Sequence, residues 1–284
     1  MRIGKFQSND GLLFVGLVQD QDVVVLGDLA KEPGLFSKIL HAANPEHEVE
    51  SRTKSSAKKI PLASTIPLVP IDQQEVWAAG VTYLRSREAR ERESEGAAKF
   101  YDLVYKAQRP ELFFKSPPAK VASFGQKVRI RKDSKWSVPE PELTLVVSPV
   151  GKIVGFTIGN DMSARDIEGE NPLYLPQAKM YSGACAIGPV VTLARFLPQG
   201  EACSIHLQIH RAGAQVFEGK TSLASMARKL EDLVSWLFKE NDFPDGAFLL
   251  TGTGVVPPDQ FTLLSGDVIR IEIAGIGVLE NTVE

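Results

Sequence analysis

The sequence predicts a β-rich α+β fold, in which a small N-terminal β unit precedes one larger domain. Three observations support this fold class. Strand-like apolar runs recur along most of the chain after residue 75, whereas only two segments there have convincing helical spacing. This excess of strands argues against an alternating βα barrel and favours a mixed sheet. An early apolar hairpin, followed by a polar stretch, marks off the N-terminal unit.

The N-terminal unit begins with two Val- and Leu-rich runs, at 11–18 and 22–27. The short polar segment between them is typical of a turn, so the two runs predict a β-hairpin. A short helix is expected over 36–43. It should end there because Asn44 and Pro45 follow, and proline disfavours helical continuation.

A polar and basic stretch over 44–60, which contains proline, serine and lysine, is interpreted as a connector. With the hairpin before it, this stretch predicts a small β domain over 1–65 and a larger domain over 66–284. The chain has 284 residues, of which 43% are hydrophobic. That is enough to bury a full core in one large domain, or in a large and a small one.

The larger domain is expected to contain a helix over 84–107 and another over 222–240. In the second, leucine and methionine recur at helical spacing before Asn241 and Pro244 end the pattern. Apolar runs bounded by polar residues and glycines predict strands elsewhere. These are expected over 112–114, 127–131, 142–148, 153–159, 189–194, 203–210, 247–251 and 267–273.

Composition excludes several classes of function. The formal net charge is -3, with basic residues spread along the chain, so no nucleic-acid partner is expected. Cys185 and Cys203 lack CxxC spacing, which argues against a disulfide framework and fits a reducing cytoplasm. No apolar run approaches the roughly 18 residues of a membrane span or resembles a signal peptide. The sequence therefore predicts a cytoplasmic protein that has no membrane partner.

Two carboxylates open the apolar strand expected at 142–148. Glu140 and Glu142 are spaced by two, so in an extended chain their side chains point to one face, with Cβ atoms roughly 6.5–7 Å apart. Like charges aimed at one place repel unless a cation lies between them or one takes a proton. Carboxylate oxygens suit hard divalent ions such as Mg2+. The alternative is a pair of solvent-facing glutamates at a strand start.

Further polar residues follow the neighbouring strands. Asp161 comes after the next strand and would complete a three-oxygen metal site, although an ordinary polar turn is the alternative. Lys179 lies in a mostly uncharged stretch, where it would bind a substrate carboxylate or act as a base if desolvated; the alternative is a surface lysine. The turn Thr251-Gly-Thr-Gly254 offers N–H groups and hydroxyls to an anion. It lacks the lysine and spacing of a nucleotide-binding phosphate loop.

In order and spacing, these segments resemble the fumarylacetoacetate hydrolase family over roughly residues 74–283. The matching residues are Phe113-Phe-Lys115, Glu140-x-Glu142, Asn160-Asp161-x-Ser-Ala-Arg165-Asp166, Lys179, Gly188-Pro189, Thr251-Gly-Thr253, Gly266-Asp267 and Gly275-Ile-Gly-x-Leu-x-Asn281. The resemblance implies a catalytic domain built on a rolled mixed β-sheet. It implies Mg2+, with Mn2+ or Ca2+ as alternatives, held by Glu140, Glu142 and Asp161, and it implies that Lys179 lies at the substrate.

A narrower resemblance covers residues 104–115, 139–143 and 163–177, which look like the 2-keto-3-deoxy-arabinonate dehydratases of this family. It implies that Glu111 lies at the substrate, opposite Lys179. The implied activity is Mg2+-dependent dehydration of a 2-keto-3-deoxy-pentonate to 2,5-dioxopentanoate through a metal-stabilised enolate. One of the two residues would take the C3 proton and the other would assist departure of the C4 hydroxyl.

The chain departs from the hydrolytic relatives near the start of this domain. Those carry Gly-x-Asn-Tyr-x-x-His-x-x-Glu, whereas here Ser86 stands at the histidine position and Ala89 at the glutamate position. Because that histidine helps to activate water in the relatives, its replacement argues against hydrolysis of a C–C bond. Arg87 is a candidate contact for a substrate carboxylate, with a helix-surface arginine as the alternative. The other candidate substrate contacts are Tyr83, Arg165 and Thr253.

Other activities remain open from the sequence. An acylpyruvate hydrolase or an oxaloacetate decarboxylase of the same family would use the same metal chemistry. A non-catalytic sensor of sugar acids is a further alternative, although a sensor need not keep both the three carboxylates and Lys179. The expected partner in every case is a small 2-oxo acid. By analogy with the family, a homodimer or homotetramer is expected.

Overall fold

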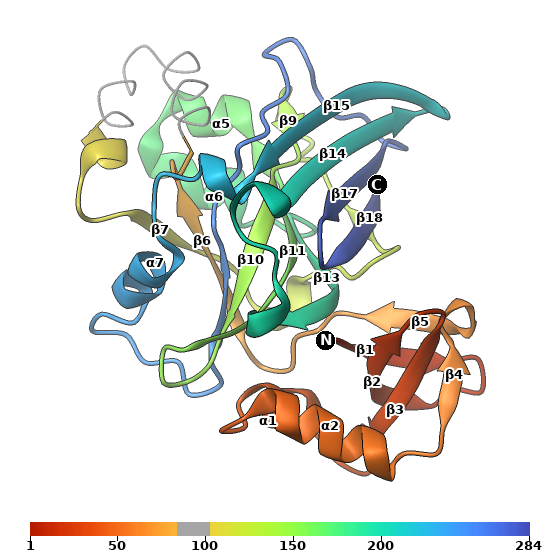
Figure 1. The fold of residues 1–284 in the computed structure, drawn as a ribbon. Helices are drawn as coiled ribbons and strands as arrows, with labels where there is room; N and C mark the ends of the chain where they lie inside the picture. The colour runs from red at the N-terminus through yellow and green to blue at the C-terminus, as the bar shows by residue number, and fades with distance from the viewer. Residues whose placement is uncertain (84–102) are drawn as a thin grey trace.

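The computed structural model describes residues 1–83 and 103–284 and has the predicted β-rich α+β fold (Figure 1). Its strands are β1 Arg2–Ser8, β2 Leu13–Gln19, β3 Asp22–Asp28, β4 Lys59–Pro61, β5 Thr65–Leu68, β6 Glu75–Gly80, β7 Glu111–Ser116, β8 Lys127–Val128, β9 Ser137–Val138, β10 Pro141–Val147, β11 Ile153–Asp161, β12 Ser163–Ala164, β13 Cys185–Leu193, β14 Ser204–Arg211, β15 Ala214–Ser222, β16 Ala247–Leu250, β17 Val268–Ile273 and β18 Gly277–Val283. The α-helices that lie wholly within the described residues are α1 Leu35–Leu40, α2 Pro45–Ser55, α5 Arg165–Glu170, α6 Leu175–Lys179 and α7 Leu230–Leu237.

Two mixed sheets form the body of the protein. The larger has the strand order β4-β3-β2-β1-β13-β11-β10-β16-β6-β7, with β5 paired to β1, and the smaller has the order β15-β14-β17-β18-β8. Most pairs are antiparallel, but β6 runs parallel to β16 and β8 runs parallel to β18. Apolar side chains of β10 and β11 pack with those of β14 and β17 in one core. This packing leaves the polar ends of β10 and β11 at one side of the larger sheet.

The predicted N-terminal hairpin is confirmed as β2 and β3, and the predicted helix at 36–43 as α1. Figure 1 shows β1 to β5 together with α1 and α2. Strand β1 was not predicted from the sequence, and it joins this unit to β13 of the larger sheet by pairing Ile3 with Val191. The division of the chain into domains 1–65 and 66–284 stays a prediction. Strand β1 pairs with β2 of the first part and with β13 of the second.

The interpretation of residues 44–60 as a connector is wrong, because α2 occupies most of that stretch. Its first turn is capped by the side chain of Asn44, which accepts the backbone N–H of His47 at 3.0 Å. Only Pro45 and Val49 of this helix are buried. A helix that buries only two residues shows no helical spacing of apolar residues, so the sequence pattern did not predict it.

The predicted helix over 222–240 is too long. Its first residues belong to the end of β15 and a 3₁₀ turn, and only α7 is α-helical, burying Leu233, Val234 and Leu237. The eight predicted strands are all present, in β7, β8, β10, β11, β13, β14, β16 and β17. The predicted helix at 84–107 lies mostly outside the described residues, and within it residues 103–106 are helical. No helix in the described ranges has the length and apolarity to cross a membrane.

Candidate active site

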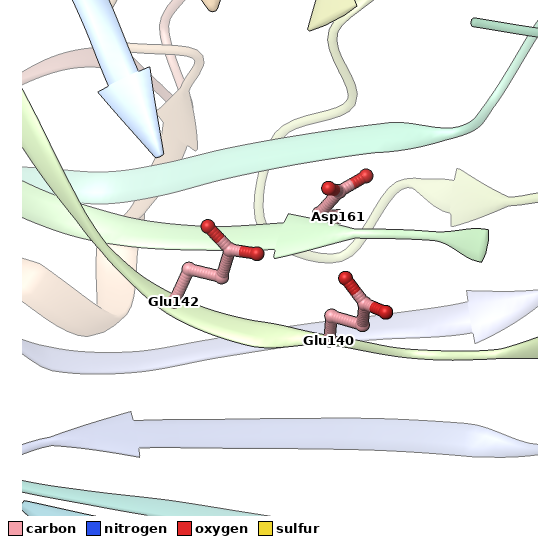
Figure 2. A group of neighbouring side chains, drawn as sticks. All are labelled: Glu140, Glu142 and Asp161. Carbon is pink, nitrogen blue, oxygen red and sulfur yellow. The ribbon is translucent and has the colours of Figure 1, made fainter. Parts of the chain in front are cut away.

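Three carboxylates converge at the polar ends of β10 and β11 (Figure 2). Glu140 immediately precedes β10, Glu142 lies within it, and Asp161 is the last residue of β11. The two strands are antiparallel, and the N–H of Asp161 donates to the backbone oxygen of Glu140 at 3.0 Å. One oxygen from each carboxylate lies within 4.8 Å of the others. The i, i+2 spacing and the strand end therefore bring together the residues that the sequence singled out.

Burial distinguishes this group from an ordinary acidic surface. Glu140 is 4% exposed, Glu142 1% and Asp161 2%, so the alternatives of solvent-facing glutamates and a surface turn are wrong. The pKa of Glu142 is raised well above its ordinary value, chiefly by burial and then by the charges of Asp161 and Glu140. Two groups oppose this rise, Lys179 and the N–H of Gly252, which donates to Glu142 at 2.6 Å. Three buried carboxylates that converge in this way offer the hard oxygen donors that a divalent cation such as Mg2+ prefers.

Buried cations surround the carboxylates. Lys179 donates from Nζ to Oε2 of Glu140 at 2.6 Å and to Oδ2 of Asp161 at 3.1 Å. Arg165 donates from Nη2 to Oε1 of Glu140 at 2.7 Å. Both side chains are 1% exposed, so the alternative of a surface lysine at 179 is wrong. Arg165, a candidate substrate contact in the sequence, lines the same pocket and bonds to a carboxylate of the group.

Lys115 is a member of the site whose role the sequence did not reveal. It lies on β7, is 1% exposed, and forms an ion pair with Asp161. Its ammonium also donates to the backbone oxygens of Met162, at 3.1 Å, and Lys179. These bonds tie β7 to the end of β11 and to the end of α6. Lys115 stood out in the sequence as a lysine in an otherwise apolar run and as part of the family match, but neither feature identified its partners.

A small pocket opens onto these groups. Glu111, the first residue of β7, lines it, as the dehydratase resemblance implied. Glu111 pairs with Gly80 across β6 and β7, and its carboxylate lies where a Cβ at residue 80 would be. The other lining residues are Ala79, Gly80, Val81, Phe113, Glu140, Glu142, Asp161, Arg165, Lys179, Gly252 and Thr253.

The remaining candidate substrate contacts have different positions. Thr253 lines the pocket, but its hydroxyl bonds to the backbone N–H and oxygen of Val255, both at 3.1 Å. Tyr83 is buried outside the pocket lining and packs close to Gly254. Burial also raises the pKa of Tyr83 far above its ordinary value. Arg87 lies outside the described residues.

The chain is similar to known dehydratases in sequence. It is 46% identical over 264 residues to the probable 2-keto-3-deoxyxylonate dehydratase of Haloferax volcanii, covering 93% of this chain and 89% of that protein. It is 42% identical over 218 residues to the 2-dehydro-3-deoxy-D-arabinonate dehydratase of Saccharolobus solfataricus, covering 76% of this chain and 73% of that one. These similarities extend over the strands that carry Glu140, Glu142 and Asp161.

The fold is also similar to that of a solved relative. The structure of a 2-keto-3-deoxy-D-arabinonate dehydratase complexed with magnesium and 2,5-dioxopentanoate matches with a TM-score of 0.78 and 32% identity, over 100% of this chain and 99% of that one. The family model for the fumarylacetoacetate (FAA) hydrolase C-terminal domain matches residues 75–284. The chain therefore belongs to the fumarylacetoacetate hydrolase family.

Proposed function

We propose that this protein is a lyase that dehydrates a 2-keto-3-deoxy-pentonate to 2,5-dioxopentanoate with Mg2+ bound. The observation that carries the proposal is the buried cluster of Glu140, Glu142 and Asp161, with Lys179 against it and Glu111 lining the same pocket. The substrate class is that of the dehydratases to which the chain is similar. The test is the Mg2+-dependent appearance of the aldehyde product from such an acid.

The three carboxylates are the proposed metal ligands. A divalent cation held there supplies a Lewis acid for the ketone and carboxylate oxygens of a 2-oxo acid. Mg2+ is the ion of the solved relative, and Mn2+ or Ca2+ would accept the same oxygen donors. Lys115 and Arg165 keep Asp161 and Glu140 oriented, because each holds one carboxylate oxygen by a buried ion pair.

Lys179 and Glu111 are the proposed proton-transfer residues. Dehydration removes a proton from C3 and the hydroxyl from C4, which departs with a proton as water. Movement of a further proton from C5, with reprotonation of the chain carbons, then gives the C5 aldehyde. One residue serves as base and the other as acid, and Lys179 acts as a base only when it is neutral. In the structure its ammonium bonds to Glu140 and Asp161, so a cation bound by those carboxylates would compete with the lysine for their oxygens.

The acids derived from D-xylonate and D-arabinonate are expected to be the same substrate. A 2-keto-3-deoxy-pentonate keeps a single stereocentre, at C4, because the centres at C2 and C3 are lost. The xylonate and arabinonate names of the relatives therefore describe one compound when both sugars belong to the D series. The pocket needs to recognise the 2-oxo acid end and one hydroxyl configuration.

Metal binding is expected to strengthen as the pH rises, because Mg2+ displaces protons from the carboxylates. In the metal-free protein the pKa of Glu142 lies well above its ordinary value of 4.5. The contribution of Glu142 to stability is thus full below that ordinary value and is lost as the pH rises through the folded-state pKa. The rise in Tm on adding Mg2+ should be smaller near pH 5 than near pH 8, because the cost of removing the proton from Glu142 falls as the pH rises.

Thermal unfolding of the chelator-treated protein, with and without MgCl2 across this pH range, measures the effect. Glu142→Gln lacks a proposed ligand as well as the titrating group, so its Mg2+-induced rise in Tm should be small at every pH. A Mg2+-induced Tm shift that is the same at both ends of the range would contradict the raised pKa of Glu142.

A further inference from the structure

Arg228 makes an unusual set of contacts outside the pocket. It lies between β15 and α7, and its guanidinium donates to three backbone carbonyl oxygens. Nη2 bonds to Val104 at 2.8 Å and to Ala107 at 2.9 Å, and Nη1 bonds to Gln108 at 3.2 Å. Within the described ranges, Arg228 forms no ion pair with a carboxylate. Its bonds instead fix one short segment of backbone that leads to Glu111.

The contacts of Arg228 are suited to the end of a helix. Residues 103–106 are helical, and the N–H of Ala107 closes that turn onto Leu103 at 2.9 Å. The last carbonyls of a helix have no partner within it and carry partial negative charge. A guanidinium offers several donors in a fixed plane, so one arginine binds several such oxygens at once.

A second arginine holds the same segment to α7. The guanidinium carbon of Arg109 lies 4.4 Å from the ring centroid of Trp236, which belongs to α7. A cation over an aromatic face at this distance is attractive. Only Pro110 separates Arg109 from Glu111. The segment that leads into β7 is thus held at residues 104–108 by Arg228 and at Arg109 by Trp236.

The turn that carries Arg228 also contacts the residues that follow β6, the strand paired with β7. The N–H of Ala227 donates to the backbone oxygen of Thr82 at 2.9 Å, and Met226 forms an isolated bridge with Tyr83. Thr82 follows Gly80 and Val81, which line the pocket. Residues 226–228 therefore contact the chain on both sides of the residue pair that Gly80 and Glu111 form.

We infer that Arg228 is a positioning residue, which fixes Glu111 over Gly80 by holding residues 104–108. This inference rests on the proposed function, because it assumes that Glu111 takes part in proton transfer. Arg228 is absent from the pocket lining, so its effect on turnover passes through the backbone. Displacing a catalytic group by about 1 Å is enough to slow turnover by about 100-fold.

Arg228→Met is the principal test. It keeps much of the side-chain length and removes all three hydrogen bonds. We expect kcat to fall by about 30-fold, with a smaller change in KM and no change in Mg2+ affinity, because Glu111 is not a proposed metal ligand. Arg228→Lys keeps the charge but loses the planar set of donors, so it should recover only part of the lost rate. Arg270→Met, which removes a partly exposed arginine paired with Glu272 on β17, should leave the rate unchanged.

A double-mutant cycle with Glu111→Gln separates positioning from general destabilisation. If Arg228 acts through Glu111, Arg228→Met should cost less than about 3-fold once Glu111 has been replaced, because coupled residues are not additive. Gly80→Ala should reproduce the loss caused by Arg228→Met, since its Cβ would displace the carboxylate of Glu111 directly. A full 30-fold loss in the Glu111→Gln background would overturn the inference.

Hydrogen exchange tests the anchoring without any assay of turnover. In Arg228→Met the amides of residues 104–112 should exchange faster than in the wild type, while those of β10 and β14 should be unchanged. Unchanged exchange at 104–112 would overturn the inference, whatever the activity. If the wild-type protein dehydrated no 2-keto-3-deoxy acid, the proposed function would fail instead, and the exchange result would still decide whether Arg228 anchors this segment.

Discussion

Replacing Glu142 by glutamine is expected to weaken Mg2+ binding and to lower turnover by about 1000-fold, the loss typical of removing one electrostatic contact from a catalytic centre. Glutamine has nearly the same shape, and its amide oxygen still accepts the N–H of Gly252, which now bonds to Glu142 at 2.6 Å. The change therefore removes a charge with little change in packing. Calorimetric titration with Mg2+, together with initial rates at saturating Mg2+, measures both effects.

The metal-free Glu142→Gln protein supplies an internal check. Because burial and two like charges raise the pKa of Glu142, its neutral replacement should leave the metal-free Tm equal to or above that of the wild type. Glu50→Gln, which removes an exposed carboxylate from α2, is the matched control and should leave both measurements unchanged. Wild-type affinity for Mg2+ in Glu142→Gln would exclude Glu142 as a metal ligand.

Lys179→Met is expected to lower turnover by up to about 10,000-fold while leaving the metal site intact, because it removes a general acid or base without removing a metal ligand. Methionine fills a similar volume in a position that is 1% exposed. The lysine ammonium now bonds to Glu140 and Asp161, so it competes with a cation for their oxygens. Mg2+ affinity should accordingly be equal to or higher than that of the wild type.

Rates and Mg2+ titrations on the same Lys179→Met preparation separate the two roles of the lysine. Lys31→Met, at a side chain that is 85% exposed, controls for the loss of a positive charge. Near-normal turnover in Lys179→Met would show that the lysine moves no proton. Loss of Mg2+ binding would show instead that the lysine maintains the carboxylates.

The metal-ligand candidates were predictable from sequence because their relation is local. Glu140 and Glu142 lie on one strand with a spacing that sets their direction, and Asp161 ends the next strand along the chain. An antiparallel pair joined by a short turn brings such residues together. The role of Glu111 came from the resemblance to the dehydratases, and the pocket lining is consistent with it.

The supporting residues were not predictable, because their partners are distant in sequence. Lys115 meets Asp161 only once β7 is folded beside the ends of β11 and α6. Arg228 meets Gln108 across 120 residues, and no local pattern marks an arginine that binds carbonyl oxygens. The same limit explains α2, whose polar sequence hides a helix, and the overlong helix assigned to 222–240, where apolar spacing continued from β15 into α7.

The most direct test of dehydration is to incubate the purified protein with a 2-keto-3-deoxy-D-pentonate and Mg2+ and to identify the products by 13C NMR. We expect 2,5-dioxopentanoate, formed with Mg2+ and abolished by a chelator. Pyruvate and glycolaldehyde would show that the C3–C4 bond is cleaved, and would contradict dehydration. Binding of the acid without any product would contradict catalysis itself and favour a sensor of sugar acids.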